Sequence, residues 1–259
     1  MANVWQRKSL WPGRPLPETI ENDWNRFYWD FPDIYDKFAV SARPVVRSLR
    51  GIVGLDGMVV ADVGSGTGRS TFEVAQFASL VIGIEPWEPM RQFAVMKQRE
   101  IGAKNVAFVE GLAQALPLTD RSVDVVMSSA GVPLTLESEF GGVIGDQFVR
   151  DARRAVRPGG YVVHSSIAPD APPAEWTDLP RDAINPSCVE EAKLLIDGYG
   201  FDFHDVWIEQ RYQNTQEAIE SYGFIYGQRC IEYLRRTGRT SFQMKIRIYL
   251  ERSETTPAL

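Results

Sequence analysis

The chain has 259 residues, of which 44% are hydrophobic and 24% charged, and its formal net charge is −6 at pH 7. This composition is that of a globular protein with one large domain, or one domain and a small cap. The acidic balance argues against a nucleic-acid-binding surface, because phosphate recognition depends on clustered lysines and arginines. No apolar run approaches the roughly 18 residues of a membrane-spanning helix, and the N-terminal segment lacks the apolar core of a signal peptide. The chain has only two cysteines, Cys188 and Cys230, too few for a disulfide framework. Together these features predict a reduced, cytoplasmic protein.

The N-terminal part of the sequence predicts an aromatic-rich helical cap over residues 1–53. Residues 1–17 predict an irregular segment, and residues 18–53 predict helices punctuated by Pro32 and Pro44. Seven aromatic side chains fall between positions 24 and 38. They either anchor these helices to the rest of the fold or form a lid over a ligand, and both interpretations stay open at this point.

Residues 54–259 predict a second, larger domain in which short apolar runs alternate with amphipathic segments. Strands are predicted at residues 58–63, 80–85, 105–109, 123–129, 161–167, 204–211 and 242–251. Helices are predicted at residues 69–78, 89–101, 145–156, 187–199 and 215–236. Apolar strands separated by helices predict a parallel sheet covered on both faces. Right-handed crossovers make this a doubly wound, Rossmann-like α/β fold, which binds ligands at the carboxyl ends of its strands.

Two parts of this second domain are predicted to shape its acceptor side. Residues 168–187 contain too many prolines for a regular element, and residues 215–236 predict a long helix. Gly223 and Gly227 are four positions apart, so on a continuous helix they would share one face and permit close packing.

A glycine-rich loop follows the first predicted strand, in the stretch MVVADVGSGTGRST at residues 58–71. Gly64, Gly66 and Gly68 give the spacing G-x-G-x-G, whereas Arg69 stands where the dinucleotide fingerprint G-x-G-x-x-G has its third glycine. Asp62 precedes the loop by two residues, and such an acid would repel a diphosphate but attract an ammonium group. The loop therefore favours S-adenosylmethionine, which carries an amino-acid end and no phosphate, over a dinucleotide.

A second acid, Glu85, ends the strand at residues 80–85, about twenty residues after the loop. A carboxylate at this place accepts hydrogen bonds from both hydroxyls of a ribose. Proteins that bind NAD share this feature, so Glu85 supports the assignment only together with the loop spacing.

Residues 58–167 resemble the class I S-adenosylmethionine-dependent methyltransferases, of the type 11 group related to ubiquinone and menaquinone methyltransferases. The resemblance rests on four segments in family order, namely VADVGSGTG, VIGIEP, EGLAQALPLTDRSVDVV and ARRAVRPGGYVV, the last with Pro158–Gly160 as a turn. It implies a seven-stranded, mostly parallel sheet whose last strand is antiparallel. Leu112 departs from the family, which often has an acid there to accept from the adenine amino group.

The resemblance also implies which residues bind the cofactor. The positions are Tyr35, Phe38, Asp62, Gly64, Ser65, Gly66, Thr67, Gly68, Glu85, Pro86, Met90, Leu112, Ala113, Gln114, Ser128 and Ser129.

Methyl transfer from a sulfonium needs alignment of the reactants more than it needs a catalytic triad. If the acceptor is a hydroxyl, a base would help, and the candidates are His164 and Asp146. His164 is more readily interpreted as a buried strand residue with a satisfied imidazole than as a catalyst. Neither histidine stands at metal-ligand spacing, so no metal is predicted. The predicted partner is a small-molecule methyl acceptor. An NAD-dependent oxidoreductase and a non-catalytic S-adenosylmethionine-binding protein are the alternatives, and the oligomeric state is not predicted.

Overall fold

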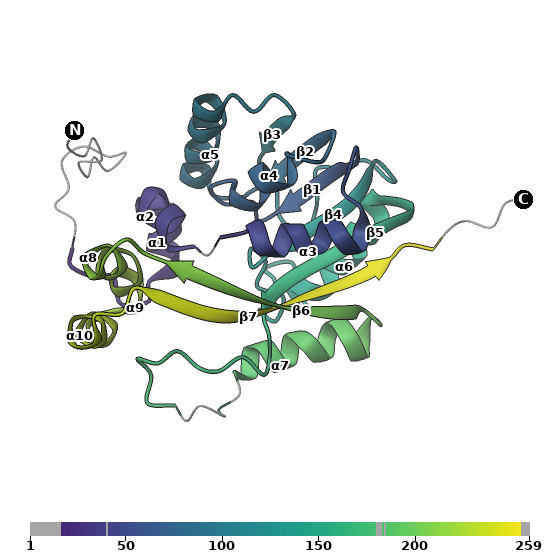
Figure 1. Cartoon of the computed structure of the whole chain (residues 1–259). Helices are drawn as coiled ribbons and strands as arrows, with labels where there is room; N and C mark the ends of the chain where they lie inside the picture. The colour runs from purple at the N-terminus through teal and green to yellow at the C-terminus, as the bar shows by residue number, and fades with distance from the viewer. Residues whose placement is uncertain (1–16, 40, 180–182, 184, 255–259) are drawn as a thin grey trace, which may run out of the picture.

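The computed structural model describes residues 17–39, 41–179, 183 and 185–254, so the irregular segment expected at residues 1–17 lies outside the described residues except for Pro17. In this part of the chain, seven strands form one sheet in the order β3-β2-β1-β4-β5-β7-β6 (Figure 1). The strands are β1 (Val59–Val63), β2 (Leu80–Ile84), β3 (Val106–Val109), β4 (Val123–Ser129), β5 (Val156–Ile167), β6 (Asp202–Arg211) and β7 (Ser241–Arg252). Only β7 runs antiparallel to its neighbours, β5 and β6. The predicted doubly wound fold is confirmed.

Successive strand residues point to opposite faces of the sheet, and in the central strands both sets are apolar. Helices therefore cover both faces. Val60 and Val125 pack with α3 (Arg43–Val53) and α4 (Arg69–Val74) in one apolar cluster. Ala61 and Val126 pack on the other face with α6 (Ile144–Ala155) and with the helix formed by α7 (Pro186–Ala192) and η1 (Lys193–Gly198). A further helix, α5 (Glu88–Ile101), contacts β3 at the edge of the sheet.

The turn expected at Pro158–Gly160 lies within strand β5, which begins at Val156. Val156 pairs with Val123 and Tyr161 pairs with Val125, so a register shift absorbs the extra residues as a bulge-like irregularity. Gly160 approaches the Asp124 carbonyl so closely that no β-carbon would fit between them. The prediction that a turn at Pro158–Gly160 precedes a strand starting at residue 161 was therefore wrong, because the strand already begins at Val156.

The long helix expected at residues 215–236 is interrupted. It consists of α8 (Thr215–Ala218), η2 (Ile219–Gly223), α9 (Phe224–Tyr226) and α10 (Gln228–Thr237). Gly227, at φ 87°, ends α9, and a β-carbon there would overlap the Glu21 carboxylate, which accepts a hydrogen bond from the Gln228 amide at 3.0 Å. The expectation that Gly223 and Gly227 share one face of a continuous helix was wrong, because a contact with a distant segment fixes the break.

The N-terminal helices α1 (Trp24–Asp30) and α2 (Pro32–Phe38) pack against α8–α10 at the end of the sheet where β6 ends and β7 begins (Figure 1). Backbone hydrogen bonds join Ile20 to Phe224 (2.9 Å) and Asn22 to Ile225 (2.7 Å). Residues 43–53 instead form α3 on the sheet face. In the described part of the chain, no helix is long and apolar enough to cross a membrane.

Candidate functional site

The glycine loop joins β1 to α4 and takes a left-handed backbone at each glycine. The φ angles are 69° at Gly64, 54° at Gly66 and 84° at Gly68, a region that glycine enters without a steric penalty. A β-carbon on Gly64 would lie 2.5 Å from the carbonyl oxygen of Gly131, in the loop after β4. The loops after two central strands therefore touch backbone to backbone, which fixes the edge of the site.

Asp62 lies at the end of β1 and is only 1% exposed. Its Oδ2 accepts a hydrogen bond from Thr71 Oγ1 at 2.6 Å. Burial raises the pKa of this carboxyl from 3.8 to about 7, and the nearby Glu85 carboxylate adds to the rise. The site thus holds a buried acid that a cationic ligand group would stabilise in its ionised form.

Glu85 directly follows β2, and its carboxylate binds the backbone of the glycine loop and that of Trp87. Its Oε2 accepts from the Gly66 amide at 2.8 Å, and its Oε1 accepts from the Trp87 amide at 2.9 Å. Burial raises the pKa of this carboxyl, whereas the two amide hydrogen bonds lower it. A carboxylate offers about four acceptor positions, so hydroxyl groups can still bind to Glu85 while it holds the loop.

A cavity of about 300 Å³ opens beside the glycine loop, at the carboxyl ends of β1, β4 and β5. The carboxyl-terminal ends of these strands and the loops after them contribute Gly64, Ser65, Thr67, Ser129, Ala130, Ser165 and Ser166. The N-terminal helices and the C-terminal helices contribute the aromatic side chains Trp24, Tyr28, Tyr35, Phe38, Tyr222 and Tyr226. Polar residues at the strand ends and an aromatic cover thus meet in one partly open cavity.

Helix α2 is fastened to the glycine loop. Asp36 accepts hydrogen bonds from Thr67 Oγ1 at 2.8 Å and from Lys97 Nζ of α5 at 2.8 Å. The ring of Tyr35 lies 3.5 Å from the position of a β-carbon on Gly66. The aromatic side chains that anchor α1 and α2 therefore also line the cavity, and their role as a lid over a ligand stays a prediction.

Some of the expected cofactor residues line the cavity and others lie nearby or away from it. Tyr35, Phe38, Gly64, Ser65, Thr67 and Ser129 line it. Gly66, Glu85 and Met90 adjoin it, since the Met90 methyl group lies 3.4 Å from a β-carbon position on Gly66. Gly68 is covered by the Phe72 and Phe108 rings, Pro86 is exposed, and Ser128 is buried within β4.

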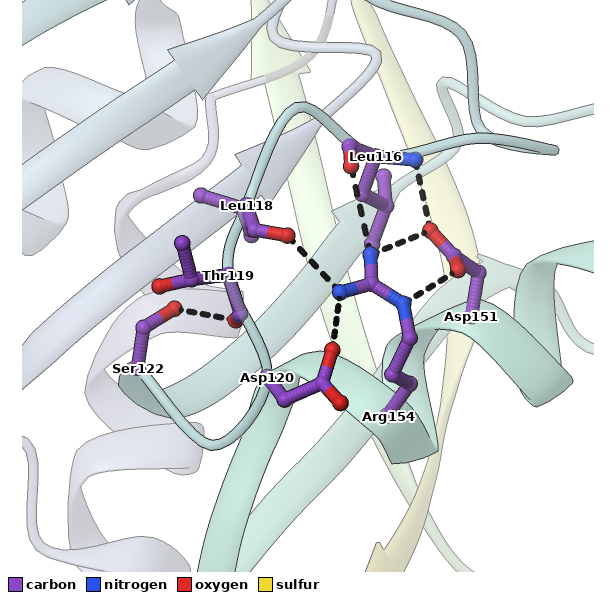
Figure 2. A network of polar contacts seen from close by, with 7 residues as sticks. All are labelled: Leu116, Leu118, Thr119, Asp120, Ser122, Asp151 and Arg154. Carbon is purple, nitrogen blue, oxygen red and sulfur yellow. Dashed lines mark hydrogen bonds and ion pairs between the residues drawn. The ribbon is translucent and has the colours of Figure 1, made fainter.

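Leu112, Ala113 and Gln114 lie in the loop after β3, outside the lining of the cavity. Arg154 of α6 holds the C-terminal half of this loop, as Figure 2 shows. Its guanidinium donates to the carbonyls of Leu116 (3.3 Å) and Leu118 (2.7 Å) and pairs with Asp120 and Asp151. Asp151 in turn accepts from the Leu116 amide at 2.6 Å. The network fixes the path of the chain from β3 to β4.

The two candidate bases do not line the cavity. His164 is fully buried between Phe148 and Tyr249, with Nε2 3.1 Å from Glu191 Oε1. Its neighbour Ser165 lines the cavity, and alternation along β5 places the His164 side chain on the opposite face. Asp146 lies on α6 and accepts a hydrogen bond from the Tyr199 hydroxyl at 2.7 Å. The geometry therefore gives neither residue access to a ligand in the cavity.

Arg69, Ser165, Tyr222 and Tyr226 line the cavity, although the sequence analysis did not assign them to the site. Arg69 is adjacent to the glycine motif, so its position was a usable signal. Tyr222 and Tyr226 carried no such signal, because their place depends on how a distant helix docks. Among the described residues, no group of three His, Cys, Asp or Glu side chains is arranged to hold a metal.

Comparison with known proteins agrees with this geometry. Residues 61–164 match the family described as "Methyltransferase domain". This part of the chain is a class I S-adenosylmethionine-dependent methyltransferase domain. The resemblance inferred from the sequence is therefore confirmed, and S-adenosylmethionine is the cofactor of this family.

Curated relatives of this methyltransferase domain act on different acceptors. The chain is 31% identical to an arsenite methyltransferase of Halobacterium salinarum over 154 residues, which is 56% of this chain and 38% of the relative. It is 30% identical to a malonyl-[acyl-carrier protein] O-methyltransferase of a Marinomonas species over 140 residues, which is 54% of this chain and 49% of the relative. The chain thus spans half or less of the length of these relatives.

A solved structure supports the fold over a longer stretch. The YcgJ protein of Bacillus subtilis superposes with a TM-score of 0.56 at 15% identity, covering 82% of this chain and 98% of that one. This likeness extends the shared fold beyond the family match.

Proposed function

We propose that the protein is an enzyme that transfers a methyl group from S-adenosylmethionine to a small-molecule acceptor. The observation that carries this proposal is the glycine loop flanked by the buried acids Asp62 and Glu85, inside a methyltransferase domain and beside a partly open cavity. A buried acid at the loop favours an ammonium group over a diphosphate, which argues against the NAD-dependent alternative.

Asp62 and Glu85 would each bind a different group of the cofactor. Asp62 would bind the ammonium group, because its raised pKa reports a carboxyl without a cationic partner. Glu85 would accept from the ribose hydroxyls while its present bonds hold Gly66 and Trp87 in place. Met90, Pro86 and the loop residues Leu112, Ala113 and Gln114 would surround the adenine. The loop residues Gly64–Gly68, together with Tyr35, Phe38, Ser128 and Ser129, would complete the cofactor site.

The bound cofactor supplies an activated methyl group on a sulfonium, so the protein has to orient the acceptor and keep water away. The aromatic side chains of α1, α2 and α8–α10 close the cavity, and the Asp36 contacts hold this cover on the glycine loop. Neither His164 nor Asp146 lines the cavity, so we propose that transfer depends on alignment and exclusion of water.

We further propose which parts of the chain form the cover, the methyltransferase domain and the acceptor side. Of the cap expected at residues 1–53, the described helices α1 and α2 would form the cover, whereas α3 packs on the sheet of the methyltransferase domain proposed for residues 54–259. Residues 168–187 and 215–236 shape the acceptor side, supported by Tyr222 in the cavity wall and by Trp176, whose ring lies 5.4 Å from that of Tyr222. Cys188 and Cys230 are free and buried, which supports a cytoplasmic, reducing location and no direct role in acceptor binding. The net charge of −6 supports a small-molecule partner over a nucleic acid.

The proposal is tested by transfer of label from methyl-tritiated S-adenosylmethionine to small molecules of a cell extract. We expect label to appear in the low-molecular-mass fraction with the wild-type protein. Gly66→Val should abolish it, because a branched side chain would meet Tyr35 and Met90 at a left-handed backbone position. Gly51→Ala, in α3 with open space around it, is the matched control. Absence of labelled product with a protein that binds the cofactor would support the non-catalytic alternative.

A further inference from the structure

Arg69 places a positive charge in the wall of the cavity. It is the first residue of α4, directly after the glycine loop, and it lines the cavity together with Tyr35 and Tyr222. From this side chain we propose that the methyl acceptor is an anion, a flat apolar molecule bearing a carboxylate that Arg69 binds. The inference rests on the proposed methyl transfer and narrows its acceptor class.

Within the described residues, the guanidinium of Arg69 has no hydrogen-bond acceptor and no ion-pair partner. Asp36, a carboxylate that interacts with the charge of Arg69, already binds Lys97 with both oxygens and Thr67 with one. Burial lowers the pKa of Arg69, which shows that the charge is partly withdrawn from water. A guanidinium has five N–H donors and matches a carboxylate in a bidentate arrangement. Such a cation in a cavity wall is complementary to an incoming anion.

The remaining walls suit a flat, apolar body. Val45, Ile208 and Ile246 line the cavity from α3, β6 and β7, opposite the aromatic cover. Burial raises the pKa of Tyr226 to about 12 and that of Tyr222 higher still, so both phenols stay protonated and can donate hydrogen bonds. The described residues of the lining therefore combine apolar contact surface with hydrogen-bond donors and one cation, and none of them is a carboxylate.

The cofactor has a carboxylate of its own, which is the alternative partner of Arg69. The charge of Arg69 interacts with Tyr212, directly after β6, with Tyr222 of η2, and with Tyr35 and Asp36 of α2. Tyr222 belongs to the segment proposed to shape the acceptor side, which favours an acceptor anion as the partner of Arg69. An acceptor anion would also offset the two positive centres of the cofactor, which Arg69 alone would repel.

The test compares two probes of the same shape, 1-naphthoate and its neutral analogue 1-naphthamide. Both are titrated by calorimetry into wild-type protein saturated with S-adenosylhomocysteine, and into Arg69→Gln and Arg69→Lys. Arg47→Gln, an exposed arginine of α3, is the control for loss of one charge. Circular dichroism and thermal unfolding verify that each variant is folded.

We expect the wild-type protein and Arg47→Gln to bind naphthoate at least tenfold more tightly than naphthamide. Arg69→Gln should reduce this ratio to near one, and Arg69→Lys should keep part of it. A ratio near one in the wild type, binding of neither probe, or a ratio that Arg69→Gln leaves unchanged would each overturn the proposal. A tenfold loss of S-adenosylhomocysteine affinity in Arg69→Gln with an unchanged ratio would assign Arg69 to the cofactor instead. A naphthoate preference in a protein that binds no S-adenosylhomocysteine would keep the anion site and refute the methyltransferase proposal.

Discussion

Replacing Asp62 by asparagine should make the protein more stable and unable to hold its cofactor. The amide has nearly the same shape and can still accept from Thr71, which now donates to Asp62 at 2.6 Å. It removes, however, a carboxyl whose pKa burial raises from 3.8 to about 7. This rise of about three pKa units corresponds to about 4 kcal/mol of unfavourable free energy when the group is ionised.

The sign of the pH dependence follows from this rise. Because the folded state holds the proton of Asp62 more tightly than the unfolded chain does, folding takes up a proton between about pH 4 and pH 7. The wild-type protein therefore loses this contribution to its stability as the pH rises through this range, whereas Asp62→Asn lacks the contribution at every pH. The stability difference between the two should grow by about 2 kcal/mol from pH 5.5 to pH 8 and level off above pH 7.

Urea denaturation at several pH values measures this difference, and calorimetry with S-adenosylmethionine measures the loss of affinity, which we expect to exceed tenfold. Asp56→Asn is the control, since Asp56 is an exposed carboxylate paired with Arg50 and lies outside the cavity lining. A stability difference that is constant or shrinks with rising pH would refute the electrostatic reasoning. Unchanged affinity in Asp62→Asn would refute the role assigned to this acid.

Three further predictions concern the loop, its cover and the buried histidine. Gly64→Ala should reduce stability by more than 2 kcal/mol and abolish cofactor binding, because its β-carbon would lie 2.5 Å from the Gly131 carbonyl; a soluble variant with normal melting and affinity would contradict this. Asp36→Asn should speed dissociation of S-adenosylhomocysteine about fivefold or more, since it weakens the contacts that hold α2 on the loop; stopped-flow fluorescence measures the rate, and an unchanged rate would show that α2 is not part of the cover. His164→Asn should lower the melting temperature, because it removes one of two side-chain partners of the half-buried Glu191, while the cofactor dissociation constant stays unchanged. A change in that constant with unchanged melting would return His164 to the site.

The sequence predicted what depends on neighbouring residues. The run at residues 123–129 is a strand with those bounds, because apolar residues alternate little in a strand covered on both faces. The glycine loop was predicted because left-handed turns and close backbone contacts restrict the choice of residue at three nearby positions.

The remainder depends on contacts between distant segments. The break at Gly227 is fixed by Glu21, more than two hundred residues earlier in the chain. Tyr222 and Tyr226 reach the cavity only because η2 and α9 dock on α2 and α1. His164 attracted attention as one of two histidines, but the strand's register places its side chain under α7, beside Glu191.

Calorimetric titration of the purified protein with S-adenosylhomocysteine and, separately, with NAD tests the central claim most directly. The claim is that a buried acid beside bare glycine amides selects an amino-acid end over a diphosphate. We expect micromolar binding of S-adenosylhomocysteine and no heat with NAD. Binding of NAD with no response to S-adenosylhomocysteine would contradict the account.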